Sequence, residues 1–180
     1  MCIRDRILGE GSNVLIHDRG FNGIVIKMET KGITVVKENQ KFLRIKVMAG
    51  EKWDDFVTYT VENGLWGIEN MSYIPGTVGA LPVQNVGAYG QEACQTIDFV
   101  EVWDTIDKKI QFIANDLCQF SYRKSIFNTS FKNRYVIISV NFILKKKSSP
   151  NLDRYQVWDV LRKINKNILF RIYYKISSYM

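Results

Sequence analysis

The 180-residue sequence has little histidine, cysteine and proline, with one, three and three residues respectively. The cysteines, Cys2, Cys94 and Cys118, are odd in number, far apart and without close Cys or His neighbours at metal-ligand spacing. We therefore expect free thiols in a reducing compartment and no metal site. The single histidine, His17, stands among charged residues after a short apolar segment, so we interpret it as a turn residue rather than a general base.

The sequence also lacks a long apolar run. The apolar segment over residues 7–16 is interrupted by two glycines and three polar residues at positions 9–13, which excludes a signal peptide and a membrane span there. With 46% hydrophobic residues, the chain is long enough to bury a core, and we expect one domain and part of another. A cytoplasmic protein without a membrane partner is the expectation.

The formal net charge of +7 favours an anionic partner, either nucleic acid or a phosphorylated small molecule. Lysines and arginines are scattered singly except at residues 145–147, and no basic stripe alternates with aromatic residues as a single-strand binding surface requires. We interpret this triplet as a solvated strand end and expect neither nucleic acid nor an obligate protein as partner. A noncatalytic basic module that binds a polyanion is one alternative.

Short segments rich in branched residues predict an α+β fold with a mostly antiparallel sheet and flanking helices. The strands are expected at residues 7–8, 14–16, 24–28, 33–36, 42–47, 97–104, 110–113 and 134–144. The three segments between residues 24 and 47 are expected to be antiparallel and joined by hairpins. In the last strand, Val136, Ile138, Val140 and Phe142 are expected on one face. Ile137 and Ile143 are expected to help fill the other face, so that both faces are covered.

A helix is predicted between Glu51 and Asn63, because apolar residues recur there at three- and four-residue steps and Gly64 follows as a left-handed stop. Residues 115–119 are expected to form one helical turn. A further helical pattern lies around Leu161, after Pro150.

The first motif that could carry chemistry is LGEGSNVL at residues 8–15. Its two glycines let the backbone pack closely around an anion, while Ser12 and Asn13 supply side-chain donors. A pyrophosphate fits such a loop. A turn that serves only geometry is the alternative, because neither a dinucleotide fingerprint nor a phosphate-loop lysine is present.

The second motif is IPGTVGALPVQNVGAYG at residues 74–90. Backbone amides together with Thr77, Gln84 and Asn85 can converge there on a polar, planar ligand. A surface loop is the alternative, but such loops rarely carry so many apolar residues between their glycines.

The third motif is FSYRKSIF at residues 120–127. Apolar neighbours would hold Arg123 in a pocket, where its guanidinium could stabilise an enolate oxygen or a carboxylate. The alternative is a surface arginine whose stem covers apolar neighbours.

In this order and spacing, the three motifs resemble the bacterial UDP-N-acetylenolpyruvoylglucosamine reductase (MurB) family over about residues 7–144. The resemblance implies the two-part FAD-binding fold shared with vanillyl-alcohol oxidase, and a reaction in which NADPH reduces FAD and the flavin reduces the enolpyruvyl group of a UDP-sugar. The product would be UDP-N-acetylmuramate, a peptidoglycan precursor. Another FAD-linked oxidase of the same superfamily is the alternative, although those enzymes usually attach FAD through His or Cys motifs.

The resemblance also assigns roles to residues. Arg123 would be catalytic and the adjacent Tyr122 would bind the substrate. The residues expected to bind FAD are Gly9, Glu10, Gly11, Ser12, Asn13, Pro75, Gly76, Thr77, Gly79, Gln84, Asn85, Gly87, Ala88, Tyr89 and Gly90. The serine and the late glutamate that complete the family's catalytic set have no counterpart in this sequence. The SFKN segment at residues 130–133 is interpreted as a chance match to the family's serine motif.

The resemblance divides the chain into four parts. Residues 1–6 are expected to be a non-native leader, 7–30 the remainder of a first FAD-binding subdomain, and 31–147 a second one. Residues 148–180 are expected to be a divergent or truncated tail, with the substrate domain absent. A chain of this kind could leave a sheet edge uncovered and fail to fold stably by itself.

Overall fold

The structure is a computed structural model that describes residues 5–147. Its strands are β1 (Arg6–Leu8), β2 (Val25–Lys27), β3 (Ile33–Glu38), β4 (Phe42–Met48), β5 (Gly87–Ala88), β6 (Gln91–Glu92), β7 (Ile97–Asp104), β8 (Lys109–Ala114) and β9 (Tyr135–Lys145). The α-helix is α1 (Trp53–Glu62), and the 3-10 turns are η1 (Glu69–Met71), η2 (Val78–Ala80), η3 (Pro82–Gln84), η4 (Ala93–Gln95) and η5 (Asp116–Cys118).

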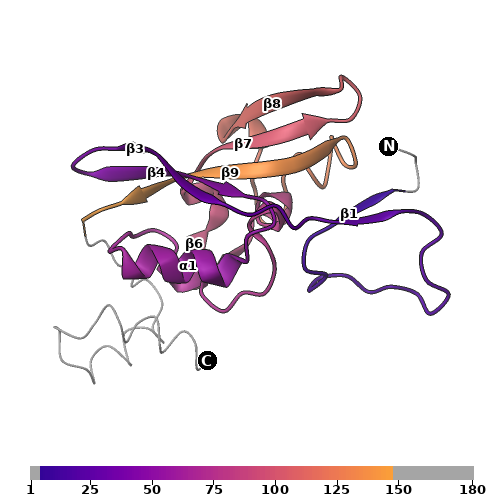
Figure 1. Cartoon of the computed structure of the whole chain (residues 1–180), viewed down its shortest axis with the longest axis horizontal. Coiled ribbons are helices and arrows are strands. Elements are labelled where there is room, and N and C mark those ends of the chain that lie inside the picture. The colour runs from indigo at the N-terminus through magenta and orange to yellow at the C-terminus, as the bar shows by residue number, and fades with distance from the viewer. Residues whose placement is uncertain (1–4, 148–180) are drawn as a thin grey trace.

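The main sheet is antiparallel and five-stranded, in the order β3-β4-β9-β7-β8. Strand β9 lies at its centre and pairs with β4 over seven residues and with β7 on its other side. The short parallel pair β1-β2 projects from one end of this sheet, next to the first long loop (Figure 1). The predicted α+β fold with a mostly antiparallel sheet is confirmed.

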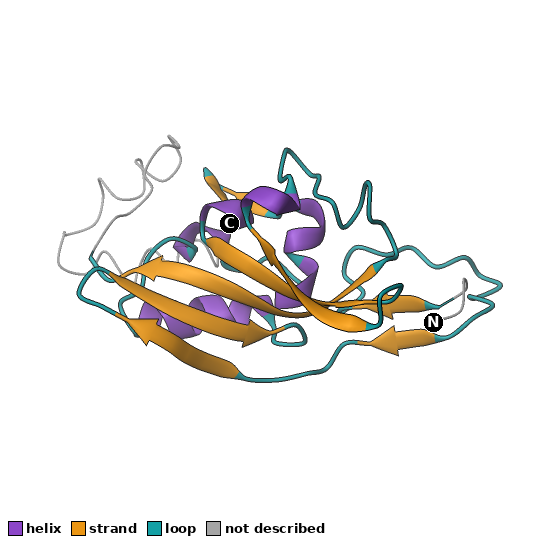
Figure 2. Cartoon of the chain, turned by 90° about the horizontal axis from the view of Figure 1, so that it is seen from above, coloured by secondary structure: helices purple, strands orange, loops and turns teal. Residues whose placement is uncertain are grey.

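Helix α1 covers one face of the main sheet (Figure 2). Its Phe56 ring lies 5.0 Å from the ring of Phe142 in β9, and Trp53 lies 6.2 Å from the same ring. The indole of Trp53 donates a hydrogen bond of 2.7 Å to the carbonyl oxygen of Met71, which satisfies its polar atom inside the core. The predicted helix is therefore confirmed, and Gly64 ends it with φ of +68°.

Two strand predictions are wrong. Residues 14–16 form a loop, in which Leu15 is 99% exposed, because no neighbouring strand pairs with this apolar segment. Strand β2 pairs with β1 in parallel rather than forming an antiparallel hairpin with the next segment. A parallel pair needs a connection long enough to return the chain to the same end, and residues 9–24 supply it.

The last strand is covered on both faces over most of its length, as predicted. Val140 and Phe142 are fully buried and Ile137 is buried, whereas Val136, Ile138 and Ile143 are half-buried. The register between β7 and β9 shifts between Glu101 and Val102, which changes the pairing toward the start of β9.

Arg6, expected within a non-native leader, lies in β1. Residues 1–4 and 148–180, including the helical pattern around Leu161, lie outside the described residues. The proposed division of the chain into four parts stays a prediction.

Candidate functional site

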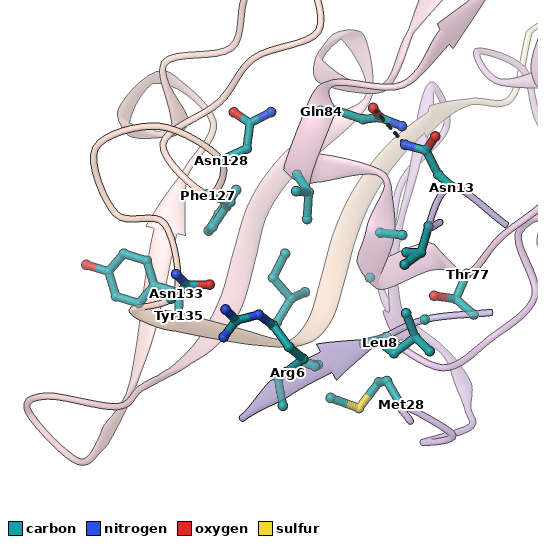
Figure 3. Close-up of a pocket in the computed structure, with 18 of the residues that line it drawn as sticks. Arg6, Leu8, Asn13, Met28, Thr77, Gln84, Phe127, Asn128, Asn133 and Tyr135 are labelled. Carbon is teal, nitrogen blue, oxygen red and sulfur yellow. Dashed lines mark hydrogen bonds between the residues drawn. The ribbon is translucent and has the colours of Figure 1, made fainter. Parts of the chain in front are cut away.

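The first and second motifs line one cavity of about 400 Å³, although some 70 residues separate them (Figure 3). Gly9 and Asn13 of the first motif and Thr77, Gly79 and Gln84 of the second are among its lining residues. Figure 3 shows Asn13, Gln84 and Thr77 on the same side of the cavity. The side-chain amide of Asn13 donates to Oε1 of Gln84 over 3.4 Å, so one polar residue from each motif meets at the cavity.

Glycines let the two motifs approach closely. A Cβ at Gly9 would lie 2.8 Å from Oγ1 of Thr77, and a Cβ at Gly79 would lie 2.6 Å from Cβ of Ala49. Both distances are shorter than side-chain carbons tolerate. At Gly76, φ is +122°, a conformation that only glycine adopts without strain. These glycines in the first and second motifs are therefore required for the backbone to pack closely around the cavity.

The second motif is fixed to the segment before α1 by backbone hydrogen bonds. Val78 and Gly79 donate to the carbonyl oxygens of Glu51 and Ala49, each over 2.9 Å, and Trp53 donates to the carbonyl oxygen of Gly76 over 3.0 Å. This part of the glycine-rich stretch is therefore held by ordered secondary structure rather than free to move.

A second cavity of about 200 Å³ brings together the end of the second motif and the third motif. Its lining includes Asn85, Gly87, Ala88, Tyr89, Gly90, Glu92, Tyr122 and Arg123. Tyr122 is 82% exposed and Arg123 is also exposed, so both side chains are open to a ligand from solvent. Arg123 has φ of +56°, an uncommon conformation for a residue with a side chain.

Asn85 connects the second motif to the third. Its side-chain nitrogen donates to Oε2 of Glu92 at 2.8 Å and to the carbonyl oxygen of Ser121 at 3.3 Å, while its side-chain oxygen accepts from the backbone N–H of Cys94 at 3.0 Å. From the other side, Asn128 donates to the carbonyl oxygen of Arg123 at 3.2 Å. Two asparagines therefore hold the turn that carries Arg123.

The predicted site residues fall into three groups. Gly9, Asn13, Thr77, Gly79 and Gln84 line the first cavity. The remaining residues from position 85 onward line the second. Glu10, Gly11, Ser12, Pro75 and Gly76 line neither, and Glu10 accepts a hydrogen bond of 3.0 Å from the backbone N–H of Gly76 through its carboxylate.

Sequence reasoning missed one wall of the first cavity, which is formed by residues 127–137. Phe127, Lys132, Asn133, Tyr135 and Ile137 line it, and they include part of the segment interpreted as a chance motif match. The sequence signal that could have indicated this wall is the alternation of aromatic and amide residues just before the last strand, as in Phe127-Asn128 and Phe131-Lys132-Asn133.

An ion pair supports this wall from behind. Arg134 donates to Oδ2 of the buried Asp104 through Nε at 2.9 Å and through Nη2 at 2.6 Å. Hydrogen bonding to Arg134, with further help from the backbone N–H groups of Ile106 and Asp107, outweighs burial and lowers the pKa of Asp104 to about 2.

The two described cysteines have free thiols. Burial, followed by the nearby charge of Asp116, raises the pKa of Cys118 to about 12. Burial is also the largest cause of the raised pKa of Cys94. Neither thiol lines the two cavities. His17 lies in a turn, where its Nδ1 accepts a hydrogen bond of 3.1 Å from the backbone N–H of Arg19.

Within residues 5–147, no helix has the length and apolar character needed to cross a membrane. In the same range, no three or more His, Cys, Asp or Glu side chains gather in a way that could hold a metal ion.

Comparisons with known proteins agree with this geometry. The FAD binding domain family matches residues 3–109. A UDP-N-acetylenolpyruvoylglucosamine reductase of Neisseria gonorrhoeae is 47% identical over 151 residues, which cover 83% of this chain and 43% of that protein. The enzyme of the same name from Bdellovibrio bacteriovorus is 40% identical over 162 residues, covering 90% of this chain and 47% of that protein.

Among solved structures, the UDP-N-acetylenolpyruvylglucosamine reductase of Thermus caldophilus is similar with a TM-score of 0.63 and 25% sequence identity, over 89% of this chain and 53% of that one. The chain thus spans less than half the length of the curated relatives it matches. It belongs to the FAD binding domain family and, within it, to the UDP-N-acetylenolpyruvoylglucosamine reductase (MurB) group.

Proposed function

We propose that this chain binds FAD noncovalently and forms the flavin-holding part of an NADPH-dependent reductase. The reaction would convert the enolpyruvyl group of UDP-N-acetylglucosamine enolpyruvate to UDP-N-acetylmuramate, a step in peptidoglycan precursor synthesis. The observation that carries the proposal is that two distant glycine motifs line one cavity. Arg123 lines a second cavity, and the adjacent residues Gln84 and Asn85 line the first and the second cavity, respectively. The names of the relatives supply the substrate.

The residues present fit a dinucleotide cofactor. A cavity of about 400 Å³ lies in the range of roughly 300 to 1,000 Å³ typical of small-molecule sites. Its lining is mostly apolar, with a few polar groups such as Asn13, Thr77 and Gln84. The close approach at Gly9 leaves no room for a side chain but leaves the backbone exposed to a ligand, as a pyrophosphate loop requires.

Bound FAD would supply hydride transfer between NADPH and the enolpyruvyl carbon. The first motif would hold the pyrophosphate, with Gly9 and Gly11 allowing close approach and with Ser12 and Asn13 donating hydrogen bonds. The glycine-rich segment would cradle the rest of the cofactor. Arg123 would place a permanent positive charge beside the oxygen on which negative charge develops, and its two asparagine supports keep that charge in position.

Two alternatives receive no specific support. A polyanion-binding module would gather unpaired basic side chains on one surface, but the two basic residues in the middle of β4 are paired with acids, Arg44 with Asp98 at 3.0 Å and Lys46 with Glu101 at 2.6 Å. For an oxidase with covalent flavin, a His or Cys should reach a cavity, and none of the described ones lines either. We also propose that the protein is cytoplasmic and has no obligate protein partner.

The test is a titration of the purified 180-residue chain with FAD, followed by flavin fluorescence and absorbance. Gly76→Arg should abolish saturable binding, because φ of +122° strains any side chain at this position. The arginine would also extend beside Ser12 of the first glycine loop, whose Oγ lies 3.4 Å from the Cβ position. Arg123→Ala should bind FAD like the parent. Gly20→Arg is the matched control, since Gly20 also has positive φ but faces open space.

Thermal unfolding followed by circular dichroism verifies that each variant is folded. A folded parent chain that fails to bind FAD would overturn the proposal. So would equal loss of binding in Gly76→Arg and Gly20→Arg.

A further inference from the structure

Strand β8 is the outermost strand on one side of the main sheet (Figure 1). Within residues 5–147 it pairs with β7 alone, in a register without shifts. The backbone N–H of Asn115, directly after β8, donates to the carbonyl oxygen of Asp98 at 3.0 Å. Hydrogen-bonded pairs alternate along antiparallel strands, so Ile110, Phe112 and Ala114 turn their backbone N–H and C=O groups away from β7. This edge of β8 can therefore accept a further strand.

Apolar side chains follow the same edge. Ile106, Ile110, Phe112 and Leu117 are each more than half exposed. The Phe112 ring packs edge to face on Phe99 of β7 at 5.7 Å, which fixes its position beside the edge. Exposed apolar side chains next to open backbone groups are the features by which one edge strand pairs with another.

The opposite edge of the main sheet is less suited to pairing. Its outermost strand, β3, shifts register with β4 between Val35 and Lys37. Such a bulge disrupts the ladder and increases the local twist, and the charged Lys37 and Glu38 further discourage a new strand. The six residues of β8, by contrast, form a regular strand in which only Lys109 carries a charge.

We propose that β8 is the contact through which two copies of this chain associate reversibly, edge to edge, into a dimer with one continuous sheet. An antiparallel pair centred on Phe112 places Phe112 beside Phe112 of the second copy and Ile110 opposite Ala114. All three residues direct their backbone groups outward, so this register joins the hydrogen-bonding groups of both strands. A two-fold contact of this kind is self-complementary and ends at two copies. It goes beyond the proposed function, because it needs no cofactor.

Charge complementarity favours a second copy as the partner. In the same register, Lys108, just before one β8, would lie near Asp116, just after the other β8, and the symmetry repeats this pair. Both side chains are exposed, and neither forms an ion pair within the described residues. Opposite charges that meet across antiparallel strands stabilise their pairing. The register also brings Ile106 near Leu117 of the second copy, so the edge matches itself in backbone, charged and apolar groups.

The test is sedimentation of the purified 180-residue chain at increasing concentration, without FAD. The mass of the parent should rise from one chain to two and no further. Lys108→Asp and Asp116→Lys each turn two attractive pairs into repulsive ones, so each should weaken self-association about tenfold at low salt. An equimolar mixture of the two variants should regain the parent affinity, because a mixed dimer again holds two pairs of opposite charge.

Two control variants make the same charge changes away from β8. Lys41→Asp lies in the turn between β3 and β4, and Glu62→Lys lies at the end of α1, both at exposed positions. Neither should change the association constant. Aspartate tolerates positive φ better than most residues, which suits the φ of +51° at Lys108. Thermal unfolding followed by circular dichroism verifies that each variant is folded.

A folded parent chain that keeps the mass of one chain at every concentration would overturn the inference. So would growth beyond two copies, or a mixture of Lys108→Asp and Asp116→Lys that associates no better than either variant. Equal weakening by Lys41→Asp would also overturn it, since the effect would then follow net charge rather than the edge. None of these results bears on the flavin titration, so failure of the inference and failure of the proposed function are distinguishable.

Discussion

The backbone N–H of Gly76 donates a hydrogen bond to the carboxylate of Glu10 at 3.0 Å, across 66 residues of sequence. This bond ties the first glycine loop to the second at the edge of the cavity. Glu10 was expected among the cofactor-binding residues, yet its carboxylate is committed to the protein. A negative charge would also repel a pyrophosphate, so we infer that Glu10 shapes the cavity rather than contacting the cofactor.

Substitutions at Glu10 should separate the effect of its hydrogen bond to Gly76 from the effect of its negative charge. Glu10→Ala removes the acceptor and should lower the free energy of unfolding by about 1 kcal/mol and weaken FAD binding, because the two loops are no longer tied together. Glu10→Gln keeps an oxygen acceptor and should retain both properties. Urea unfolding and FAD titration measure them, and equal behaviour of the two variants would contradict this role.

Gly9→Ala should impair FAD binding, because the added Cβ would lie 2.8 Å from Oγ1 of Thr77. That oxygen belongs to a side chain, so the double variant Gly9→Ala with Thr77→Ala should recover part of the affinity. Fluorescence titration of the single and double variants gives the comparison. If Gly9 were needed only for its backbone conformation, the double variant would bind FAD as weakly as Gly9→Ala alone, and this result would contradict the prediction.

Asn85→Ala should loosen the turn that carries Arg123. The substitution leaves the N–H of Cys94 without its partner and removes one of the two donors to the carbonyl oxygen of Ser121, which keeps the backbone N–H of Lys124. The thermal midpoint should therefore fall by several degrees, a change of about 1 to 3 kcal/mol. Gln84→Ala, at the neighbouring position in the first cavity, should leave the midpoint almost unchanged but weaken FAD binding. The reverse assignment of these two effects would show that Asn85 contacts the cofactor.

Arg134→Met should make the chain sensitive to acid. The pKa of Asp104 is lowered from 3.8 to about 2 in the folded chain, so its contribution to stability is present above about pH 4 and is lost as the pH falls toward 2. Removing Arg134 takes away the largest cause of this lowering while burial persists. The pH midpoint of acid unfolding, followed by tryptophan fluorescence, should therefore rise in the variant. An unchanged midpoint would contradict the assigned coupling.

The strands of the main sheet and the helix before the glycine-rich stretch were predictable, because residues such as Phe56, Val140 and Phe142 repeat at the periods of the elements they form. Residues 14–16 have the same local composition as a strand but no partner to pair with. Pairing depends on the whole chain, so the parallel arrangement of β1 and β2 was not readable from either segment.

The glycine motifs of the site were predictable because glycine is required wherever the backbone passes this close. The hydrogen bonds by which the Asn85 side chain holds the turn of Arg123 were not predictable, because its partners Glu92 and Ser121 reach it only in the folded chain. The wall at Asn133 and Tyr135 carries only an alternation of aromatic and amide residues, which does not show that the folded chain brings the start of β9 to the same cavity as β1.

The most direct test of the flavin cradle is a map of backbone amide chemical shifts in the ¹⁵N-labelled chain during titration with FAD. The largest changes are expected at residues 9–13, 76–84 and 87–90, with smaller ones at residues 127–137. Changes confined to the outer face of the sheet around Arg44 and Lys46, with the glycine motifs unaffected, would contradict it.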